Sequence, residues 1–543
     1  MLARGLIFSL GFILISATTQ AQSARWKITR TEWTEQDEQN FGQFITRLGE
    51  SVEKRECTHV DKCLQSPANM YVGTDPANLR LFADCADLPY YLRGYFAWKN
   101  DLPFSFQNDV NPRQGGDNKD VRYTKFGNYV TGRYGLVPGR SGGFNAVEIL
   151  NNSLVDSVWS ASFRVLGVEE GAHFTDFYPV ALSREAIRPG TVIYDPNGHV
   201  AIIYKVTDDG RIFYIDSHPD NTLTSGMYTP KFTRSFPYQG AGFKNFRPLR
   251  LENAARNSAG EFYGGRIVGV RNSQLRHFSL EQFYGNRPDP QGDWQKGQFF
   301  FRGVQFDYYE YLRLAVARGD LKIDPLNDMH QNVADICTSL KDRVVAVDVS
   351  IRAGIDRKAH PPRLPANIYG TDGEWEEYAS PARDARLKVA FMDLLAQSRQ
   401  LIKRQRAHDP GIIYNGGNLA ADLLSVYENE ARACQFAYRN SQGQSVPLNI
   451  ETARTRLFDL SFDPYHCVEL RWGASSAQEL AACQGDENKM EWYRRERWLR
   501  YQWERRYDAR MDFSLEELTG PKPGAGIAQP PDIDLIRYLN SEK

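Results

Sequence analysis

The sequence has no excess of charge of either sign. Its 66 lysines and arginines nearly balance its 67 aspartates and glutamates, so the formal net charge at pH 7 is −1. Proteins that bind nucleic acid through its phosphates carry a basic surplus or a basic stripe. The balanced composition therefore gives no indication of a nucleic-acid partner, and we predict none.

Long apolar runs are also missing after the first two dozen residues. A membrane-spanning helix needs about 20 consecutive apolar residues, and the later sequence has no such run. The start of the chain instead has Arg4, the apolar run 6–15 and the small-residue site Thr19-Gln20-Ala21, which is the pattern of a secretory signal. We predict a cleaved signal peptide over residues 1–21, with an uncleaved anchor as the alternative. The mature protein is then periplasmic or secreted, without stable membrane insertion.

Cysteine is scarce, and the seven cysteines are an odd number. In an oxidising compartment most of them should pair. Spacing favours three disulfides: Cys57–Cys63, which closes a small loop, Cys467–Cys483, which brackets a short segment, and, by elimination, Cys337–Cys434. Six cysteines allow many other connectivities, so this pairing is a hypothesis. It leaves Cys85 as a free thiol.

Cys85 lies at the predicted start of an apolar helix that ends near Lys99. Leu88, Leu92 and Phe96 recur at helical spacing and form one buried face. Asp84 is a candidate cap for this helix. Unpaired N–H groups and the dipole at a helix start favour a thiolate. We therefore interpret Cys85 as a candidate nucleophile, with a buried structural thiol as the alternative.

An antiparallel meander is predicted downstream of Cys85. Strand patterns cover residues 188–195, 198–206, 211–218 and 240–248, with a tight turn at Asp208-Asp209-Gly210. His199 opens the second strand and Asp216 lies on the third. If the turn centres on Asp209, His199 is opposite Pro219. A register change of one residue would make His199 and Asp216 diagonal neighbours on one face.

A cysteine hydrolase needs a thiolate, an imidazole beside it, and a group that holds the far nitrogen of the imidazole. Cys85, His199 and Asp216 occur in that order, and we predict that they form a catalytic triad. The backbone N–H of Cys85 would stabilise the oxyanion. His173 is the runner-up base. The alternatives without catalysis are that His199 is a strand-edge histidine with a local partner and that Asp216 is a turn residue at the end of its strand.

Two further side chains are predicted to contact substrate. Asp87 would bind an amine, and His218 would contact substrate or replace Asp216 as the orienting group. Asp216, His218 and Asp220 also form a possible metal cluster, but they lack a well-spaced fourth ligand. We therefore predict no metal site, and the proposed chemistry requires no cofactor.

Taken in their order along the chain, these motifs resemble those of the papain-like superfamily of cysteine peptidases. NlpC-type cell-wall peptidases carry an Asp-Cys pair before a helix and a Gly-His-Val strand, matched by Asp84-Cys85 and Gly198-His199-Val200. Bacterial transglutaminase-like cysteine peptidases carry Asp-Cys-x-Asp, which looks like Asp84-Cys85-Ala86-Asp87, and a strand with the triad aspartate, which looks like Tyr214-Ile215-Asp216. The resemblance covers roughly residues 80–250. It departs at Ala86 and Asp87, where NlpC-type enzymes commonly have serine and glycine, and in the long gap between Cys85 and His199.

The resemblance implies an α+β fold in which a cysteine-bearing helix packs on an antiparallel sheet. It implies a thiol hydrolase of peptide or amide bonds, acting on peptidoglycan stem peptides or a protein substrate. Two alternatives remain: a non-catalytic envelope-binding or scaffold protein on the same frame, and a transglutaminase-like acyl transferase.

Strand patterns give way to helical patterns near residue 290, and this change predicts the domain boundaries. We expect a papain-like domain over 25–285 with an insertion around 105–145, a mostly helical domain over 290–515, and a flexible tail over 516–543. The predicted C-terminal helices cover 306–317, 374–408, 418–438 and 489–511.

Overall fold

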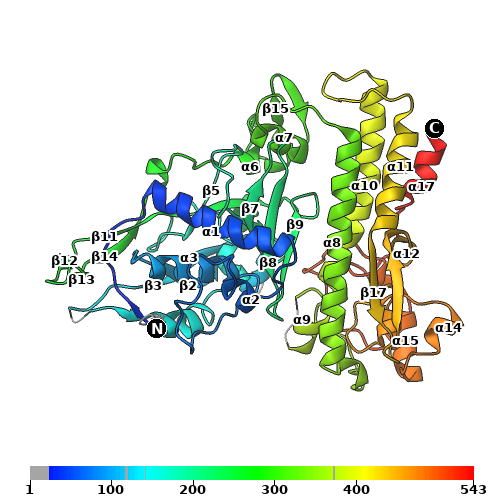
Figure 1. Ribbon diagram of the computed structural model, residues 1–543, viewed down its shortest axis with the longest axis horizontal. Helices are drawn as coiled ribbons and strands as arrows, with labels where there is room; N and C mark the ends of the chain where they lie inside the picture. Colours follow the sequence, from blue (N-terminus) through cyan, green and yellow to red (C-terminus); the bar gives the residue numbers. More distant parts are fainter. Residues whose placement is uncertain (1–23, 116–119, 141, 371–372) are drawn as a thin grey trace, which may run out of the picture.

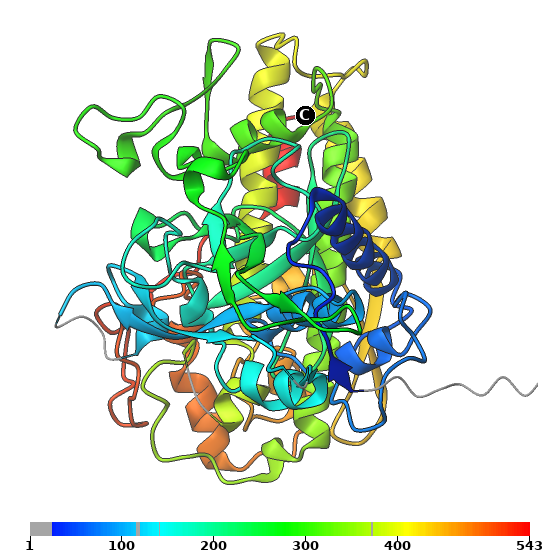
Figure 2. The same cartoon turned by 90° about the vertical axis from the view of Figure 1, so that its left-hand side faces the viewer.

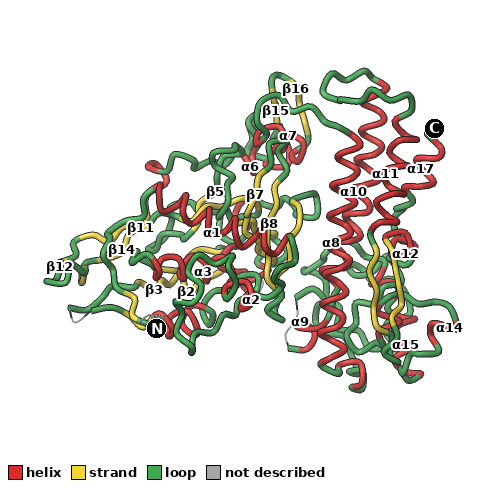
Figure 3. Tube along the Cα trace, in the orientation of Figure 1, coloured by secondary structure: helices red, strands yellow, loops and turns green. Residues whose placement is uncertain are grey.

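The computed structural model describes residues 24–115, 120–140, 142–370 and 373–543. The predicted signal peptide falls outside these residues. The chain is α+β, and it folds into two parts that lie side by side (Figure 1). One part is built around a sheet and the other around long helices, as the colouring by secondary structure shows (Figure 3).

A six-stranded antiparallel sheet forms the centre of the first part, which we call the sheet half. Its strand order is β5-β10-β6-β7-β8-β9. The strands are β5 (Phe177–Pro179), β6 (Val192–Asp195), β7 (His199–Val206), β8 (Ile212–Ser217), β9 (Leu223–Met227) and β10 (Gly242–Phe246). The four predicted strands correspond to β6, β7, β8 and β10, while β5 and β9 add the two edges.

Side chains of β7 alternate between two cores, as a strand buried on both faces requires. Val200, Ile202 and Tyr204 enter the core that also contains α1 (Glu35–Glu53) and α3 (Asp87–Lys99). The intervening Ala201 and Ile203 enter the opposite core, with side chains of α7 (Tyr308–Val316). By the same alternation His199 lies on the face of Ala201.

Smaller elements surround this sheet. They are β1 (Arg25–Trp26), α2 (Val60–Leu64), β4 (Phe144–Asn145), α4 (Ala146–Glu148), η2 (Ile149–Leu154), α5 (Ser160–Phe163), β11 (Leu249–Glu252), β12 (Ala255–Arg256), β13 (Phe262–Tyr263), β14 (Arg266–Gly269) and α6 (Glu281–Tyr284). The segment predicted as an insertion around 105–145 contains a hairpin of β2 (Ser105–Pro112) and β3 (Asn128–Gly135). The turned view shows this hairpin reaching away from the sheet (Figure 2).

The sheet half extends further along the chain than the sequence predicts. The hairpin of β15 (Phe299–Phe301) and β16 (Val304–Phe306) and helix α7 contribute side chains to the sheet core. The helical half begins only at α8 (Pro325–Arg352). The predicted boundary at 285–290 is therefore too early, because Phe299, Tyr308 and Leu312 bury their apolar side chains against the sheet.

Three long helices, α8, α10 (Pro381–Arg406) and α11 (Leu419–Ala433), pack around one core in the helical half. The other elements of this half are α9 (Glu374–Tyr378), β17 (Gln435–Arg439), β18 (Ser445–Asn449), α12 (Ile450–Thr455), α13 (Val468–Arg471), α14 (Ala477–Leu480), α15 (Glu487–Arg495), α16 (Arg497–Arg500) and α17 (Leu535–Ser541). Helix α17 packs on α11 through buried Leu535 and Leu539. The prediction of a flexible tail is therefore wrong for this segment.

Three aspartates of α8 connect the two halves. Asp328, Asp335 and Asp342 are seven residues apart, so they repeat every two turns on one side of the helix. Each pairs with a cation of the sheet half: Asp328 with Arg313 at 2.7 Å, Asp335 with Lys231 at 2.9 Å, and Asp342 with Arg55 at 2.5 Å. This row of ion pairs holds α8 against the sheet.

All three predicted disulfides are present. The S–S distances are 1.99 Å for Cys57–Cys63, 2.02 Å for Cys337–Cys434 and 2.08 Å for Cys467–Cys483. Cys85 is a free, half-buried thiol. Within the described part of the chain, no helix has both the length and the apolar character needed to span a bilayer.

Candidate active site

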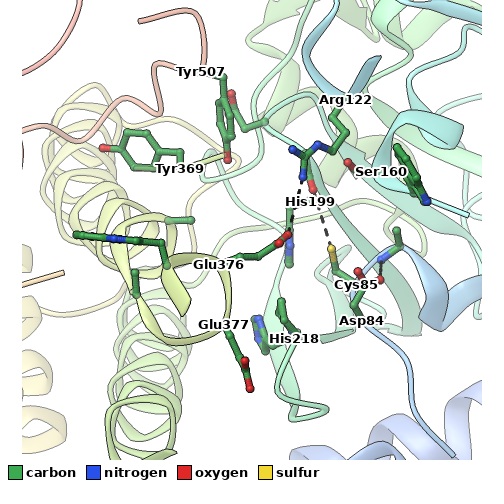
Figure 4. A pocket seen from close by; sticks show the side chains of 18 of the residues that line it. Asp84, Cys85, Arg122, Ser160, His199, His218, Tyr369, Glu376, Glu377 and Tyr507 are labelled. Atoms are coloured by element: carbon green, nitrogen blue, oxygen red, sulfur yellow. Dashed lines mark hydrogen bonds and ion pairs between the residues drawn. The ribbon is translucent and has the colours of Figure 1, made fainter. Parts of the chain in front are cut away.

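A cavity of about 620 Å³ lies at the boundary between the two halves. The sheet half contributes Cys85, His199 and His218 to its lining, and the helical half contributes α9, the start of α10 and Tyr507 (Figure 4). Its volume lies in the range of about 300–1,000 Å³ that is typical of ligand sites. The cavity is therefore large enough for a small peptide or a similar molecule.

Cys85 enters this cavity from just before α3. The helix has Ala86 as its N-cap and begins at Asp87, so Cys85 precedes the first helical residue by two positions. Oδ1 of Asp84 accepts hydrogen bonds from the backbone N–H of Ala86 at 2.8 Å and of Asp87 at 2.9 Å. Asp84 thus binds two N–H groups at the helix start as a cap would, although the N-cap position itself is Ala86. The backbone N–H of Cys85 has no hydrogen-bond partner among the described residues, so it remains available to an oxyanion.

His199 and Asp216 are brought together by a β-bulge. The ladder pairs Val206 with Ile212 and Lys205 with Phe213, then Ile203 with Tyr214 and Ile202 with Ile215. Tyr204 is the extra residue, and the register beyond it is moved by one. This is the one-residue change that the triad requires. Nε2 of His199 lies 2.6 Å from Oδ2 of Asp216.

This contact determines which nitrogen of His199 remains for chemistry. A carboxylate can only accept, so Nε2 carries the proton and Nδ1 is the basic nitrogen of the neutral ring. Oδ1 of Asp216 accepts the hydroxyl of Thr224, which fixes the carboxylate. The thiol lies near the same strand end, with Sγ 4.0 Å from the carbonyl oxygen of Gly198. Gly198 has φ +81°, and a Cβ there would lie 3.2 Å from the ring of Tyr123.

Electrostatics keep the resting thiol and imidazole neutral. Burial raises the pKa of Cys85 well above its ordinary value, and the nearby carboxylates of Asp84 and Asp216 raise it further. Burial also lowers the pKa of His199, as does the positive charge of Arg386. The thiolate-favouring effect expected at a helix start is therefore outweighed by burial, together with the acidic neighbours.

Asp216 remains charged despite its burial. Burial raises its pKa, but the neighbouring His218 and His199 more than compensate and hold the pKa below the ordinary value. The buried carboxylate can therefore stabilise an imidazolium at His199 once the ring takes up a proton.

The two predicted substrate contacts both line the cavity, in different settings. Asp87 is buried, and its pKa is raised well above the ordinary value by burial and by Asp84. His218 is also buried, with Nε2 3.1 Å from Oγ1 of Thr224 and 4.0 Å from Oδ2 of Asp216. His218 thus shares Thr224 as a partner with Asp216.

Sequence reasoning missed the contribution of the helical half. Arg383 and Arg386 of α10 line the cavity, and neither has an ion pair or hydrogen bond with another described residue. Burial lowers the pKa of Arg383. An i, i+3 arginine pair after a proline is too common in sequences to single out. In the fold, it places two guanidinium groups in the cavity that contains Cys85.

Other contacts between the halves lie beside His199. Nη2 of Arg505 is 2.6 Å from Oδ2 of Asp195, and both side chains are almost fully buried. Asp195 is the ladder partner of His199. The rings of Tyr123 and Tyr507 stack with centroids 4.5 Å apart. The helical half is therefore part of the site.

Two further predictions from the sequence concerned His173 as a base and a metal cluster. His173 is not among the residues that line the cavity. Within the described residues, Asp216, His218 and Asp220 do not converge as metal ligands. In comparisons with known proteins, no family model, no curated protein and no solved structure matches this chain.

Proposed function

We propose that this protein is a periplasmic or secreted thiol hydrolase with a papain-like core, which cleaves peptide or amide bonds. The observation that carries the proposal is the 2.6 Å contact between Nε2 of His199 and Oδ2 of Asp216, at a cavity that Cys85 also lines. The contact orients an imidazole whose Nδ1 is free to serve a nucleophile. The three disulfides suit an oxidising compartment.

In the proposed mechanism, Nδ1 of His199 accepts the thiol proton as Sγ of Cys85 attacks the substrate carbonyl carbon. General-base activation of this kind suits a resting pair that is neutral. The backbone N–H of Cys85 stabilises the oxyanion. The C–N bond then breaks, and His199 gives its proton to the leaving amine. A water, deprotonated by His199, cleaves the thioester and releases the acid.

Arg383 and Arg386 indicate the class of substrate. Guanidinium groups bind carboxylates with paired, charge-assisted hydrogen bonds. We therefore propose that the substrate carries a carboxylate near the scissile bond. Peptidoglycan stem peptides, which contain free carboxylates, are the first candidates.

The test is hydrolysis of purified peptidoglycan, with products identified by mass spectrometry. We expect new amine and carboxylate ends with the wild type, and none with Cys85→Ala or His199→Ala of equal thermal stability. Equal product release by Cys85→Ala would exclude the mechanism. Transfer of the acyl group to an added amine, in place of water, would identify an acyl transferase.

One observation favours the non-catalytic alternative. Burial and the acidic neighbours raise the pKa of Cys85, which makes its thiol a poor nucleophile at rest. A scaffold protein would bind peptidoglycan in a sedimentation assay without releasing products, and its binding would be unchanged in Cys85→Ala.

A further inference from the structure

A second cluster of histidine and carboxylate side chains lies inside the helical half, outside the cavity described above. It consists of His360, Asp463, His466 and Glu496. The side chains of all four have 0% exposure. His360 precedes α9, Asp463 and His466 precede α13, and Glu496 lies between α15 and α16. Four residues from three separate segments thus meet in a site closed to solvent.

Within the described part of the chain, no donor reaches either oxygen of Glu496, and Nε2 of His466 has no hydrogen-bond partner. A buried carboxylate without donors is strongly unfavourable, because it loses its hydration and gains nothing in return. The two carboxylates of the cluster also repel one another unless a positive charge lies between them. The cluster therefore requires a cation or a proton to balance it.

The contacts of His360 place positive charge beside Asp463, carried either by a ring proton or by an ion in its place. Nδ1 of His360 lies 2.6 Å from the carbonyl oxygen of Pro361, which can only accept, so this nitrogen carries hydrogen. Nε2 lies 2.7 Å from Oδ2 of Asp463, which also accepts, so Nε2 carries hydrogen as well and the ring is a cation unless a metal ion takes the place of that proton. Oδ1 of Asp463 is held by the backbone N–H of Tyr465 at 2.7 Å. Metal-binding histidines commonly donate their second N–H to a carbonyl in this way.

The ligand atoms of three of these residues lie close enough together to share one ion, and His466 lies beside them. Ligand atoms of His360, Asp463 and Glu496 all lie within 4.8 Å of one another. Nε2 of His466 is 3.8 Å from Oδ2 of Asp463. The disulfide Cys467–Cys483 lies next to His466 and restrains its loop.

We propose that His360, Asp463, His466 and Glu496 bind one divalent transition-metal ion, with Zn²⁺ as the best match. Two imidazole nitrogens and two carboxylate oxygens are ligands that Zn²⁺ accepts in tetrahedral geometry. Two carboxylates and a divalent ion also sum to zero charge. Four protein ligands without solvent access are typical of a structural site rather than a catalytic one.

The ion would stabilise one wall of the cavity. The ring of His360 stacks on Trp492 at 4.2 Å and contacts the ring of Trp375 edge-on at 6.5 Å. Tyr465 donates its hydroxyl to Glu374 at 2.9 Å. Glu374 and Trp375 belong to α9, and Trp375 lines the cavity. This proposal does not depend on the proposed hydrolase activity.

The experiment measures metal in the full-length secreted protein, purified without a metal-affinity tag. After equilibration with Zn²⁺ and gel filtration, we expect about one zinc per chain by elemental analysis. Removal of zinc with dipicolinate should lower the melting temperature, and Zn²⁺ should restore it. Glu496→Gln and His360→Ala should each reduce the zinc content at least tenfold. Asp384→Asn, which removes another buried carboxylate of the helical half, should leave the zinc content unchanged.

The wild type alone can overturn the proposal. A chain that retains less than a tenth of an equivalent of zinc, manganese, iron or cobalt, with a melting temperature insensitive to chelator and to added metal, does not bind a metal here. A shared proton between Glu496 and Asp463 would then balance the cluster. In that case Glu496→Gln, which keeps the shape of the side chain, would fold with little change in stability.

Discussion

His199 and Asp216 make their 2.6 Å contact because Tyr204 is bulged out of the ladder between β7 and β8. Without the bulge, His199 would be opposite Pro219, and Asp216 would lie on the other face of the sheet. The bulge therefore aligns the proposed base with its orienting carboxylate. Bulges near active sites commonly re-aim a side chain in this way.

Asp216→Asn tests this alignment. The amide preserves the shape but offers His199 a different hydrogen-bond pattern, which favours the wrong tautomer. We expect kcat/KM on peptidoglycan fragments to fall about 10²- to 10⁴-fold, with little change in melting temperature. Thr224→Val is the comparison variant, because it removes the hydroxyl that contacts Oδ1 of Asp216 and Nε2 of His218 but leaves the carboxylate bonded to His199 in place. An Asp216→Asn variant as active as this control would exclude an orienting role.

Asp84→Asn tests the electrostatic control of the thiol. Asparagine retains the Oδ1 acceptor that caps α3 but removes a charge that raises the pKa of Cys85. The pKa should fall, and alkylation by iodoacetamide at pH 7 should be faster by about 3- to 10-fold. Asp61→Asn, at an acid outside the cavity, should leave the rate unchanged. An unaltered rate in Asp84→Asn would show that burial alone sets this pKa.

Local sequence signals predicted the elements that carry the proposed triad, but not how they meet. The Gly-His-Val strand and the Asp84 cap follow from short-range chemistry. The bulge at Tyr204 does not, because it depends on packing of the tyrosine against the core of α1 and α3. Two cysteine pairs were predictable because separations of 6 and 16 residues suit short closed loops, and the third pair followed by elimination.

Long-range packing explains what sequence reasoning missed. Helix α8 was not predicted: its run Val344-Val345-Ala346-Val347-Asp348-Val349 is rich in β-branched residues, which favour strands. Its core positions, which include Ile336, Leu340 and Val347, nevertheless lie on one helical face. Arg383 and Arg386 entered the site only because α8 and α10 pack beside the sheet. No local pattern encodes that arrangement.

Arg386→Ala and Arg383→Ala test carboxylate recognition. Each substitution should raise KM for a peptide with a free carboxylate by about 10- to 100-fold, as expected for loss of a charge-assisted contact. The same peptide with that carboxylate amidated should bind the wild type and both variants equally. Arg399→Ala, on α10 but outside the cavity, is the control. Equal losses on both peptides would indicate damage to the site rather than lost recognition.

Breaking the ion pair between Arg505 and Asp195 tests whether the helical half is needed for a stable site. Removing one partner of a buried ion pair costs about 3–5 kcal/mol, because the other charge stays buried and unpaired. We therefore expect Arg505→Met to reduce the free energy of unfolding in urea by that amount. The double variant Arg505→Met with Asp195→Asn should recover part of the loss. Additive losses in the double-mutant cycle would show that the two residues are not coupled.

His218 makes stability depend on pH in a direction that can be calculated. Burial and the charge of Arg383 hold its folded-state pKa well below 6.5, whereas the unfolded chain has an ordinary pKa of about 6.5. Below that pH the unfolded state binds a proton that the folded state does not. The free energy of unfolding therefore falls as the solution is acidified, by up to about 1.4 kcal/mol per pH unit for this one group.

His218→Gln should remove this contribution. Its unfolding free energy, measured in urea between pH 5 and pH 7, should have a shallower slope than that of the wild type, with the two curves diverging only below about pH 6.5. His330→Gln, at a histidine with a 48% exposed side chain on α8, should leave the slope unchanged. Arg383→Ala should also flatten the slope, because it removes a charge that opposes protonation of His218. Parallel curves for wild type and His218→Gln would mean that the folded protein protonates His218 as readily as the unfolded chain does.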